Sequence, residues 1–306
     1  MIKLTRPMVR GKSSHILVIA TLLATLLPLP MAAPADSIRI TWDPERVKPG
    51  SVVPLRVHTP VPLMAAEAGV EAERFPLMKM ESGDYLALVG VDLNHKETVL
   101  PVDFALFPSS GGAPYRIRAD LRIKKAPAAP PVVQRLTLPT GMVDFSPPQL
   151  EKVRSDNRTL GETLAARTRD RFWGEGFILP LRGRITTRFG TGRILNGKPR
   201  SPHSGVDIAG SRGTAVKASN AGQVLMVDEF YLSGRTVVLD HGWGVSTVYA
   251  HLDTVSVSEG QFVLRGQSLG TVGSTGRATG PHLHFGAFIR GAKVDPLQLI
   301  EVTRDF

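Results

Sequence analysis

The sequence predicts a mostly β fold with two domains that are joined by a linker containing one helix. Segment 36–125 shows period-two alternation of apolar and polar residues, as in YRIRADLRI (115–123), which is typical of strands in a β-sandwich-like domain. Segment 176–306 contains further strand-like runs and many glycines, without the βαβ alternation of a parallel sheet. A chain of 306 residues is long for a single core, so two domains are expected.

The N-terminal segment 1–35 has the pattern of a secretory signal peptide. Basic residues precede an apolar run from Ile16 to Leu27, which is shorter than the about 20 residues needed to cross a bilayer. Ala33-Pro34-Ala35 fits the small-residue rule for cleavage, with Asp36 as the new N-terminus. We therefore expect an exported protein of the periplasm or cell envelope, or an extracellular one, with no membrane span in the mature chain. An uncleaved N-terminal anchor is the alternative.

The charge favours a polyanionic partner, and the lack of cysteine limits the possible chemistry. Residues 1–35 hold four basic residues and no acid, so their removal lowers the formal net charge from +10 to +6. Such a charge suits an anionic cell-wall polymer or a nucleic acid. Because there is no cysteine, thiolate metal ligands and a cysteine nucleophile are excluded. Any metal must be bound by His, Asp or Glu.

The linker is expected to span residues 126–175. It begins with the Pro/Ala segment APAAPPV (126–132), which is extended and semi-rigid. A helix then follows, with Ser146 as N-cap, Pro147 at the first helical position and Gln149 completing a capping box. The apolar spacing predicts that this helix ends near Asp170.

Three short motifs of the C-terminal half carry residues suited to a metal site. In GPHLHF, His282 and His284 are two residues apart and would project from one face of a strand. PHSGVDIAG contains His203 and Asp207, and STVYAHL contains His251. A catalytic zinc takes three protein ligands and keeps an open position, at which bound water becomes acidic enough to attack at neutral pH. Two histidines would remain for acid–base work or charge stabilisation, but spacing alone does not say which.

The order HSGVD, YAHL, GPHLHF resembles the signature of the lysostaphin-type, LytM-like peptidoglycan metallopeptidases, which have the duplicated hybrid motif fold. The similarity runs from about Phe177 to Leu299 and includes the approach RITTRFGTGR and the closing VDPLQL. Residues 38–170 resemble, less closely, the N-terminal β-domain and linker helix of an exported branch of this family. The resemblance implies an antiparallel-β zinc peptidase domain in residues 176–306.

Carried over residue by residue, the resemblance implies that His203, Asp207 and His284 bind one zinc ion per chain. His282 and His251 would then be the catalytic pair. One histidine of the HLH motif would hold the metal while its neighbour on the same face serves the reaction.

Three other positions carry expectations. His241 matches a family position that is not a ligand, so a structural role is expected. The common family form ends HLHFE, whereas this chain has Gly286 in place of the glutamate, which puts contacts at the rim of the site in doubt but not the ligands. Asn196 lies just before the first ligand, and we hypothesise a closed form in which this asparagine or a linker residue occupies the open zinc position.

The resemblance implies a zinc-dependent endopeptidase that hydrolyses peptide crosslinks of peptidoglycan, and a peptidoglycan rather than a nucleic-acid partner. An exported two-domain form favours D,D-crosslinks over glycine bridges. The alternatives are a catalytically silent LytM-like regulator that activates cell-wall amidases, a zinc amidase on a different fold, and a wall-binding protein whose histidines are incidental.

Overall fold

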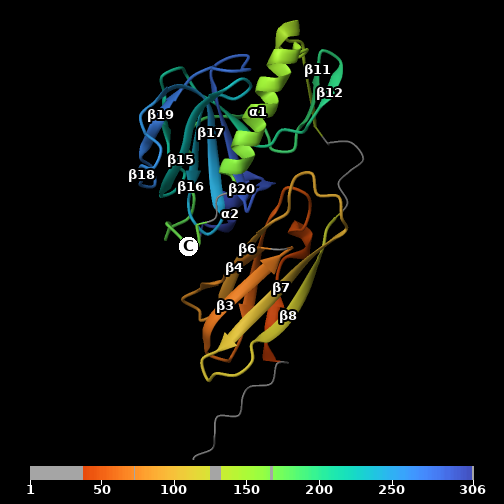
Figure 1. Cartoon of the computed structure of the whole chain (residues 1–306), viewed down its shortest axis with the longest axis vertical. Coiled ribbons are helices and arrows are strands. Elements are labelled where there is room, and N and C mark those ends of the chain that lie inside the picture. The colour runs from red at the N-terminus through yellow and green to blue at the C-terminus, as the bar shows by residue number, and fades with distance from the viewer. Residues whose placement is uncertain (1–36, 72, 125–131, 166–167, 305–306) are drawn as a thin grey trace, which may run out of the picture. The chain divides into compact units, whose positions relative to one another are not determined.

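Figure 1 shows a computed structural model of the chain, which describes residues 37–71, 73–124, 132–165 and 168–304. The described elements are mostly strands, which confirms the predicted fold class. The predicted signal peptide and most of the Pro/Ala linker segment lie outside the described residues. None of the described helices is long and apolar enough to cross a membrane.

The strands between residues 39 and 122 form two four-stranded antiparallel sheets with one shared core. The sheet orders are β1-β2-β6-β5 and β4-β3-β7-β8. Leu55, Phe104 and Leu121 are fully buried in this core. The elements are β1 (Arg39–Thr41), the short 3-10 helix η2 (Pro44–Arg46), β2 (Val52–His58), β3 (Leu63–Val70), β4 (Glu73–Pro76), β5 (Met78–Lys79), β6 (Tyr85–Gly90), β7 (Val99–Pro108) and β8 (Tyr115–Arg122).

The alternation in β8 shows why this segment forms a half-buried strand. Ala119 and Leu121 point into the core, whereas Arg118 and Arg122 are exposed. Successive side chains of a strand point to opposite faces, so the period-two pattern places one set inside and the other in solvent. The boundaries 36–125, 126–175 and 176–306 stay predictions from the sequence.

The linker region contributes a strand that the sequence did not reveal. β9 (Val133–Leu136) pairs in parallel with β11 (Gly192–Leu195), which also pairs antiparallel with β12 (Lys198–Arg200). The 3-10 helix η3 (Thr140–Met142) follows β9. The linker is therefore held against the C-terminal half of the chain by main-chain hydrogen bonds.

The linker helix α1 (Pro147–Thr163) begins where the sequence predicted and ends earlier. The side-chain oxygen of Gln149 accepts a hydrogen bond from the Ser146 N–H at 2.8 Å, as a capping box requires. The predicted end near Asp170 was wrong. Leu164 packs into a buried cluster on the sheet, and the carbonyls of Thr168 and Asp170 accept from the Trp243 N–H at 2.8 and 3.2 Å. Because these backbone groups bond to another segment, they do not continue the helix.

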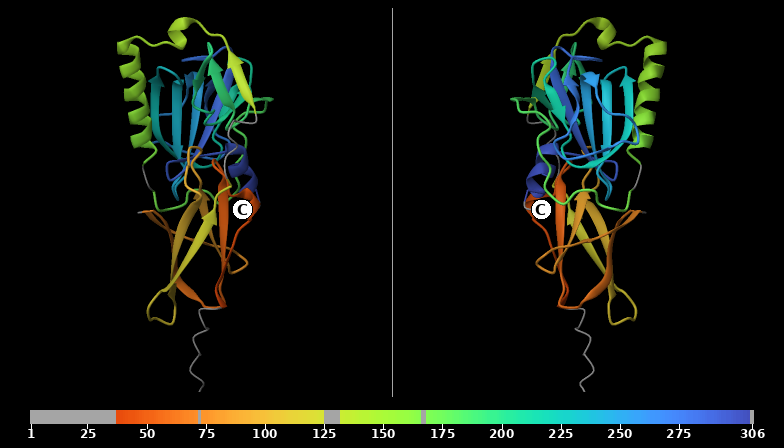
Figure 2. Two further views of the ribbon diagram at one scale, coloured as in Figure 1. Left: turned by 90° about the vertical axis from the view of Figure 1, so that its right-hand side faces the viewer. Right: turned by 90° about the vertical axis from the view of Figure 1, so that its left-hand side faces the viewer.

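A ten-stranded sheet forms the C-terminal half, and Figure 2 shows α1 running alongside it. Its main order is β10-β13-β20-β17-β16-β15-β18; β14 pairs with β19, β19 with β17, and β21 with β20. A short helix, α2 (Pro296–Val302), follows with Asp295 as its N-cap. The strands are β10 (Ile185–Thr187), β13 (Val206–Ala209), β14 (Ala215–Lys217), β15 (Gly222–Phe230), β16 (Gly234–Asp240), β17 (Val245–Val255), β18 (Phe262–Val263), β19 (Ser268–Val272), β20 (His282–Ile289) and β21 (Ala292–Val294).

His241 lies in the core of this sheet, with both ring nitrogens hydrogen-bonded. Its Nδ1 donates to the Ala221 carbonyl at 2.8 Å, and its Nε2 lies 2.7 Å from the Thr247 hydroxyl. The Thr247 hydroxyl is in turn 2.9 Å from the Tyr249 hydroxyl. Burial lowers the pKa of His241 to about 4 and raises the pKa of Tyr249, so both side chains are neutral parts of a buried polar network.

This burial predicts that His241 makes the protein sensitive to acid. The folded-state pKa lies below the unfolded value of about 6.5, so stability is fully present above pH 6.5 and falls as the pH drops toward 4. In the variant His241→Asn, the free energy of unfolding should lose less between these pH values, by up to about 3 kcal/mol. Urea unfolding of both proteins at several pH values measures the two slopes. Equal slopes would show that His241 is not buried and neutral.

Candidate metal centre

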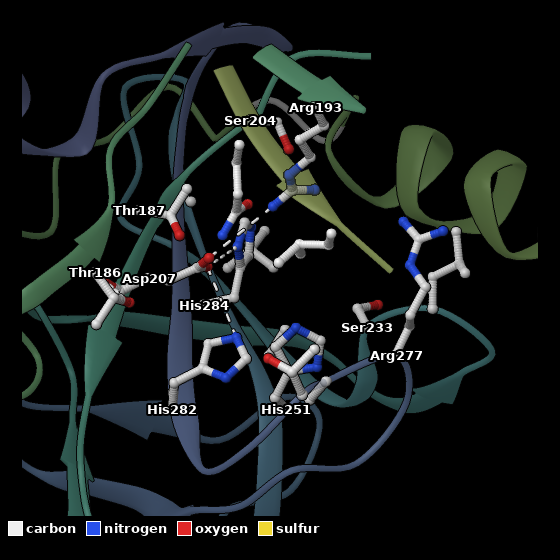
Figure 3. A pocket seen from close by; sticks show the side chains of 18 of the residues that line it. Thr186, Thr187, Arg193, Ser204, Asp207, Ser233, His251, Arg277, His282 and His284 are labelled. Atoms are coloured by element: carbon white, nitrogen blue, oxygen red, sulfur yellow. Dashed lines mark hydrogen bonds and ion pairs between the residues drawn. The ribbon is translucent and has the colours of Figure 1, made fainter. Parts of the chain in front are cut away.

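Three neighbouring strands, together with His203 in the segment between β12 and β13, bring the predicted site residues together (Figure 3). Asp207 on β13 lies opposite His284 on β20, and His284 lies opposite Ala250 on β17. His251 is the next residue of β17. His282 precedes His284 by two residues on β20, so both project toward the same face, as the sequence predicted.

His203, Asp207 and His284 each present one ligand atom to a common point. The Nε2 atom of His203 lies 2.9 Å from Nδ1 of His284 and 2.9 Å from Oδ1 of Asp207. Nδ1 of His284 lies 3.0 Å from the same carboxylate oxygen. Atoms that each lie about 2.0–2.1 Å from a tetrahedral zinc are about 3.3 Å apart. The spacing of these three atoms therefore suits one small metal ion.

Hydrogen bonds to backbone carbonyls determine which nitrogen is free on three of the histidine rings. A carbonyl oxygen only accepts, so an Nδ1 atom bonded to one carries the proton and Nε2 keeps its lone pair. For His203 this lone pair is directed at Asp207 and His284. The bonds run from Nδ1 of His203 to the Arg188 carbonyl (3.2 Å), from Nδ1 of His251 to that of Thr275 (2.8 Å), and from Nδ1 of His282 to that of Gly280 (2.8 Å).

The protonation states of His203 and Asp207 also suit a metal. Burial lowers the pKa of His203 to about 4, so its ring is neutral at pH 7. Burial raises the pKa of Asp207, but the close contacts of its carboxylate with His203 and His284 outweigh this effect and hold that pKa well below its usual range. Neutral imidazole and ionised carboxylate are the forms that bind zinc. A cation at this point would interact favourably with all three electron-rich atoms.

His251 and His282 lie beside the three candidate ligands and face each other. Their ring centroids are 4.7 Å apart, and Nε2 of His282 is 3.9 Å from Oδ1 of Asp207. Burial lowers the pKa of His251 to about 3. His251 also has a φ of +62°, a left-handed conformation that costs of order 1–3 kcal/mol outside glycine and clusters at functional sites. The backbone bends at this residue so that its side chain reaches the site.

Gly205 leaves the room that the His284 ring needs. A Cβ atom at this position would lie 2.5 Å from the Phe285 carbonyl oxygen and 2.8 Å from Cε1 of His284. Both distances are shorter than a side chain tolerates, and one obstacle is backbone. The glycine of HSGVD is therefore required by the close approach of β13 and β20.

An open groove of about 480 Å³ runs beside these residues. Its lining includes Asp207, His251, His282 and His284, and it also includes Gly286. A Cβ at Gly286 would meet nothing closer than 3.5 Å, so the glycine widens the groove where the common family form has a glutamate.

Of the two closed forms that we hypothesised, the one in which Asn196 occupies the open zinc position is not what the structure shows. The Asn196 side chain accepts from the Leu138 N–H at 2.8 Å and donates to the Leu138 carbonyl at 2.9 Å. These bonds join the linker to the hairpin of β11 and β12. Gln134 of the linker strand β9 lines the groove, so a closed form that involves a linker residue stays a prediction.

Sequence reasoning missed two arginines that line the same groove. Arg193 comes from β11, and Arg277 comes from the loop before β20 (Figure 3). Both arginines stand in glycine-rich segments, RFGTGR and GSTGRATG, and neither segment has a motif that marks the arginine as a site residue. The positive charge of the two side chains could have suggested a binding role, but only the fold shows that both line one groove.

Comparison with known proteins identifies the region that contains this site. Residues 201–296 match the model of peptidase family M23. Peptidoglycan DD-endopeptidase ShyB of Vibrio cholerae is 39% identical over 108 residues, which are 35% of this chain and 24% of ShyB. DD-carboxypeptidase/endopeptidase Mpg of Neisseria meningitidis is 44% identical over 97 residues, which are 32% of this chain and 22% of Mpg. The chain thus matches about a quarter or less of the length of these relatives.

A solved structure matches most of the chain. A Pseudomonas aeruginosa protein assigned to peptidase M23 is 27% identical with a TM-score of 0.59, and the match covers 83% of this chain and 94% of that chain. The similarity therefore extends beyond residues 201–296 into the N-terminal strands. Together these matches confirm that the chain contains an M23 peptidase domain of the LytM and lysostaphin type, as the motifs indicated.

The geometry predicts that the purified protein binds one zinc ion per chain. After dialysis against zinc and then against metal-free buffer, elemental analysis should give a ratio near one for the wild type. His203→Ala and Asp207→Ala each remove one of three ligands, so their zinc content should fall sharply.

A matched control is His58→Ala, because His58 lies on β2 and is not one of the three converging residues. This variant should keep the wild-type zinc content. Stoichiometric metal that persists in both ligand variants would place the site elsewhere.

Proposed function

We propose that this chain is a zinc-dependent endopeptidase that hydrolyses peptide crosslinks of bacterial peptidoglycan. The observation that carries the proposal is the convergence of three metal-ligating side chains beside two further histidines in one open groove. His203, Asp207 and His284 would hold the zinc. When bound, zinc would supply a Lewis acid and lower the pKa of its water toward about 7.

His251 and His282 are the residues that would serve the reaction. Both rings donate through Nδ1 to a backbone carbonyl, which fixes their orientation and leaves Nε2 facing the groove. A neutral imidazole can take a proton from the attacking water and return it to the leaving amine, and a second imidazole can stabilise negative charge on the carbonyl oxygen. Either histidine could take either role, so proton transfer and stabilisation of the carbonyl oxygen are assigned to the pair together.

Peptidoglycan is the proposed substrate on three grounds. An open groove on a sheet accommodates an extended peptide in a network better than an enclosed cavity would. The predicted signal peptide would deliver the protein to the periplasm or cell envelope, where the wall lies. Both relatives reported above are named as DD-endopeptidases, one of them also as a carboxypeptidase, which favours D,D-crosslinks over glycine bridges.

The rival proposal is a regulator of cell-wall amidases that has lost catalysis. The site argues for the enzyme, because every residue that the resemblance assigns to the metal and to the reaction is present and in contact distance of another. A silent regulator would have no need of the strained His251 backbone or of two correctly oriented histidines beside the ligands.

Substitution of the two histidines tests their proposed roles. His251→Ala and His282→Ala should keep one zinc per chain, since neither residue is a ligand. The rate should fall by a factor of order 10²–10⁴, which is the usual effect of removing an acid–base group. Turnover of a crosslinked muropeptide and zinc content are measured on the same preparations. Loss of zinc in either variant would show that it is a ligand.

Digestion of purified crosslinked peptidoglycan tests the bond that is cut. Mass analysis should show that crosslinked dimeric muropeptides become monomers, while the glycan strands and the sugar–peptide amide stay intact. His203→Ala is the negative control. Stem peptides freed from the sugar would indicate an amidase, and new reducing sugar ends would indicate a glycosidase. No product from the wild type, together with activation of a cell-wall amidase, would favour the regulator.

A further inference from the structure

Two arginines that are far apart in the sequence line the same groove. Arg193 stands on β11, whose neighbour β9 belongs to the linker, and Arg277 stands in the loop between β19 and β20. The loop is anchored by the Arg277 N–H, which donates to the Leu232 carbonyl at 2.8 Å. Both residues line the groove that contains His251 and Asp207; Figure 3 shows Arg193 next to Asp207, and Arg277 farther along, beyond Ser233.

Both guanidinium groups are partly removed from water. The Arg193 side chain is only 24% exposed. Burial lowers the pKa of Arg193 and of Arg277, and for Arg277 the nearby positive charges of Arg193 and Arg200 lower it further. The groove therefore holds two positive charges near each other, and each of them is partly shielded from water. Charges in such a position are normally paired.

Among the described residues, this pairing is incomplete. Arg193 has its ion-pair contact with Oδ2 of Asp207, at 4.0 Å, and Asp207 is a proposed metal ligand. Arg277 donates to the Met142 carbonyl at 3.4 Å, a long and uncharged contact. Among the described residues, no carboxylate forms an ion pair with Arg277 within 4.0 Å.

A third arginine nearby, Arg200, has closer contacts within the protein. Its guanidinium donates to the Val143 carbonyl at 2.8 Å and lies 3.9 Å from the Asp144 carboxylate. It also lies outside the lining of the groove that contains the histidines. Arg200 thus has a short hydrogen bond within the protein, whereas the described contacts of the Arg193 and Arg277 side chains are 3.4 Å or longer and both residues line the groove.

We propose that Arg277, together with Arg193, binds a free carboxylate of the peptide substrate close to the scissile bond. The proposal rests on the proposed function, because it concerns the substrate of that same groove. The planar guanidinium has paired donors that match the two oxygens of a carboxylate, and such charge-assisted bonds are stronger where water is partly excluded. A metal bound by Asp207 would leave Arg193 still more in need of an anionic partner.

The consequence is a defined substrate class. The groove would select crosslinked peptides that carry an ionised carboxylate near the bond that is cut. It would discriminate against neutral peptides, such as glycine bridges, and against stem peptides in which this carboxylate is a carboxamide. Arg277 is a binding residue in this account, and the proton transfers stay with the histidines.

The test compares two substrates that differ only in this group. One is a crosslinked muropeptide dimer with free carboxylates, and the other is the same dimer with carboxamides in the stem. For the wild type, kcat/KM should be about 10- to 100-fold higher on the carboxylate form, the usual range for a hydrogen bond to a charged group. Most of the difference should lie in KM, since the contact exists before the reaction begins.

Two variants of Arg277 sharpen the comparison. Arg277→Gln should lose most of the preference, because it should act poorly on the carboxylate form. Arg277→Lys keeps the charge without the paired donors and should retain part of the preference. Zinc content should equal that of the wild type in both. Arg122→Gln is the matched control, because Arg122 is exposed on β8 and its loss removes the same charge.

A binding measurement separates this inference from the proposed function. Titration calorimetry with the uncrosslinked stem peptide, in its carboxylate and carboxamide forms, needs no cleavage. Tighter binding of the carboxylate form that is lost in Arg277→Gln supports the inference even if no crosslink is cut, in which case the proposed function fails. Cleavage of both dimers at equal rates, with equal binding of both peptides, overturns the inference and leaves the proposed function intact.

Discussion

The register of three antiparallel strands is the constraint on which the site depends. β13, β20 and β17 align Asp207 with His284 and His284 with Ala250. A slip of one residue would turn both histidines of β20 to the opposite face of the sheet. The register is held by the alternate residues, because Leu283 and Phe285 point into the buried core with no exposed surface. The same alternation that builds the core therefore places His282 and His284 on the face of the site.

Backbone features then refine what the register provides. Gly205 allows the His284 ring to lie against the neighbouring strand, and the left-handed φ of His251 aims its side chain at the groove. Carbonyl oxygens at Arg188, Thr275 and Gly280 set the ring tautomers. These contacts involve main-chain atoms, which are fixed by the fold before any metal or substrate arrives. The site is thus largely preorganised, and this reduces the entropy that binding must overcome.

The sequence predicted the parts of this arrangement that depend on local pattern. The HLH motif reveals a strand with both histidines on one face, and the capping box at Ser146 locates the start of α1. The helix end at Thr163 was not predictable, because it follows from bonds between the chain after Leu164 and Trp243, far away in sequence. The parallel β9–β11 pair has the same origin, since nothing local in residues 133–136 specifies a partner some sixty residues later.

The arginines of the groove illustrate the same limit for function. Arg193 and Arg277 are separated by a long stretch of sequence, and each looks like an ordinary surface cation in its own segment. Only the tertiary structure shows that they line one groove with the proposed metal ligands and that both guanidinium groups are partly buried there. Residue types at motif spacing identify the chemistry, whereas the charge that selects a substrate emerges from the fold.

X-ray absorption spectroscopy of the zinc-loaded protein tests the central claim most directly, because it reports the ligands around the metal. The account predicts two imidazole nitrogens and carboxylate or water oxygens at about 2.0–2.1 Å. The number of imidazoles should stay the same in His251→Ala and fall to one in His284→Ala. Three or more imidazoles in the wild type, or a loss of one in His251→Ala, would contradict the assignment of His203, Asp207 and His284 as the metal ligands.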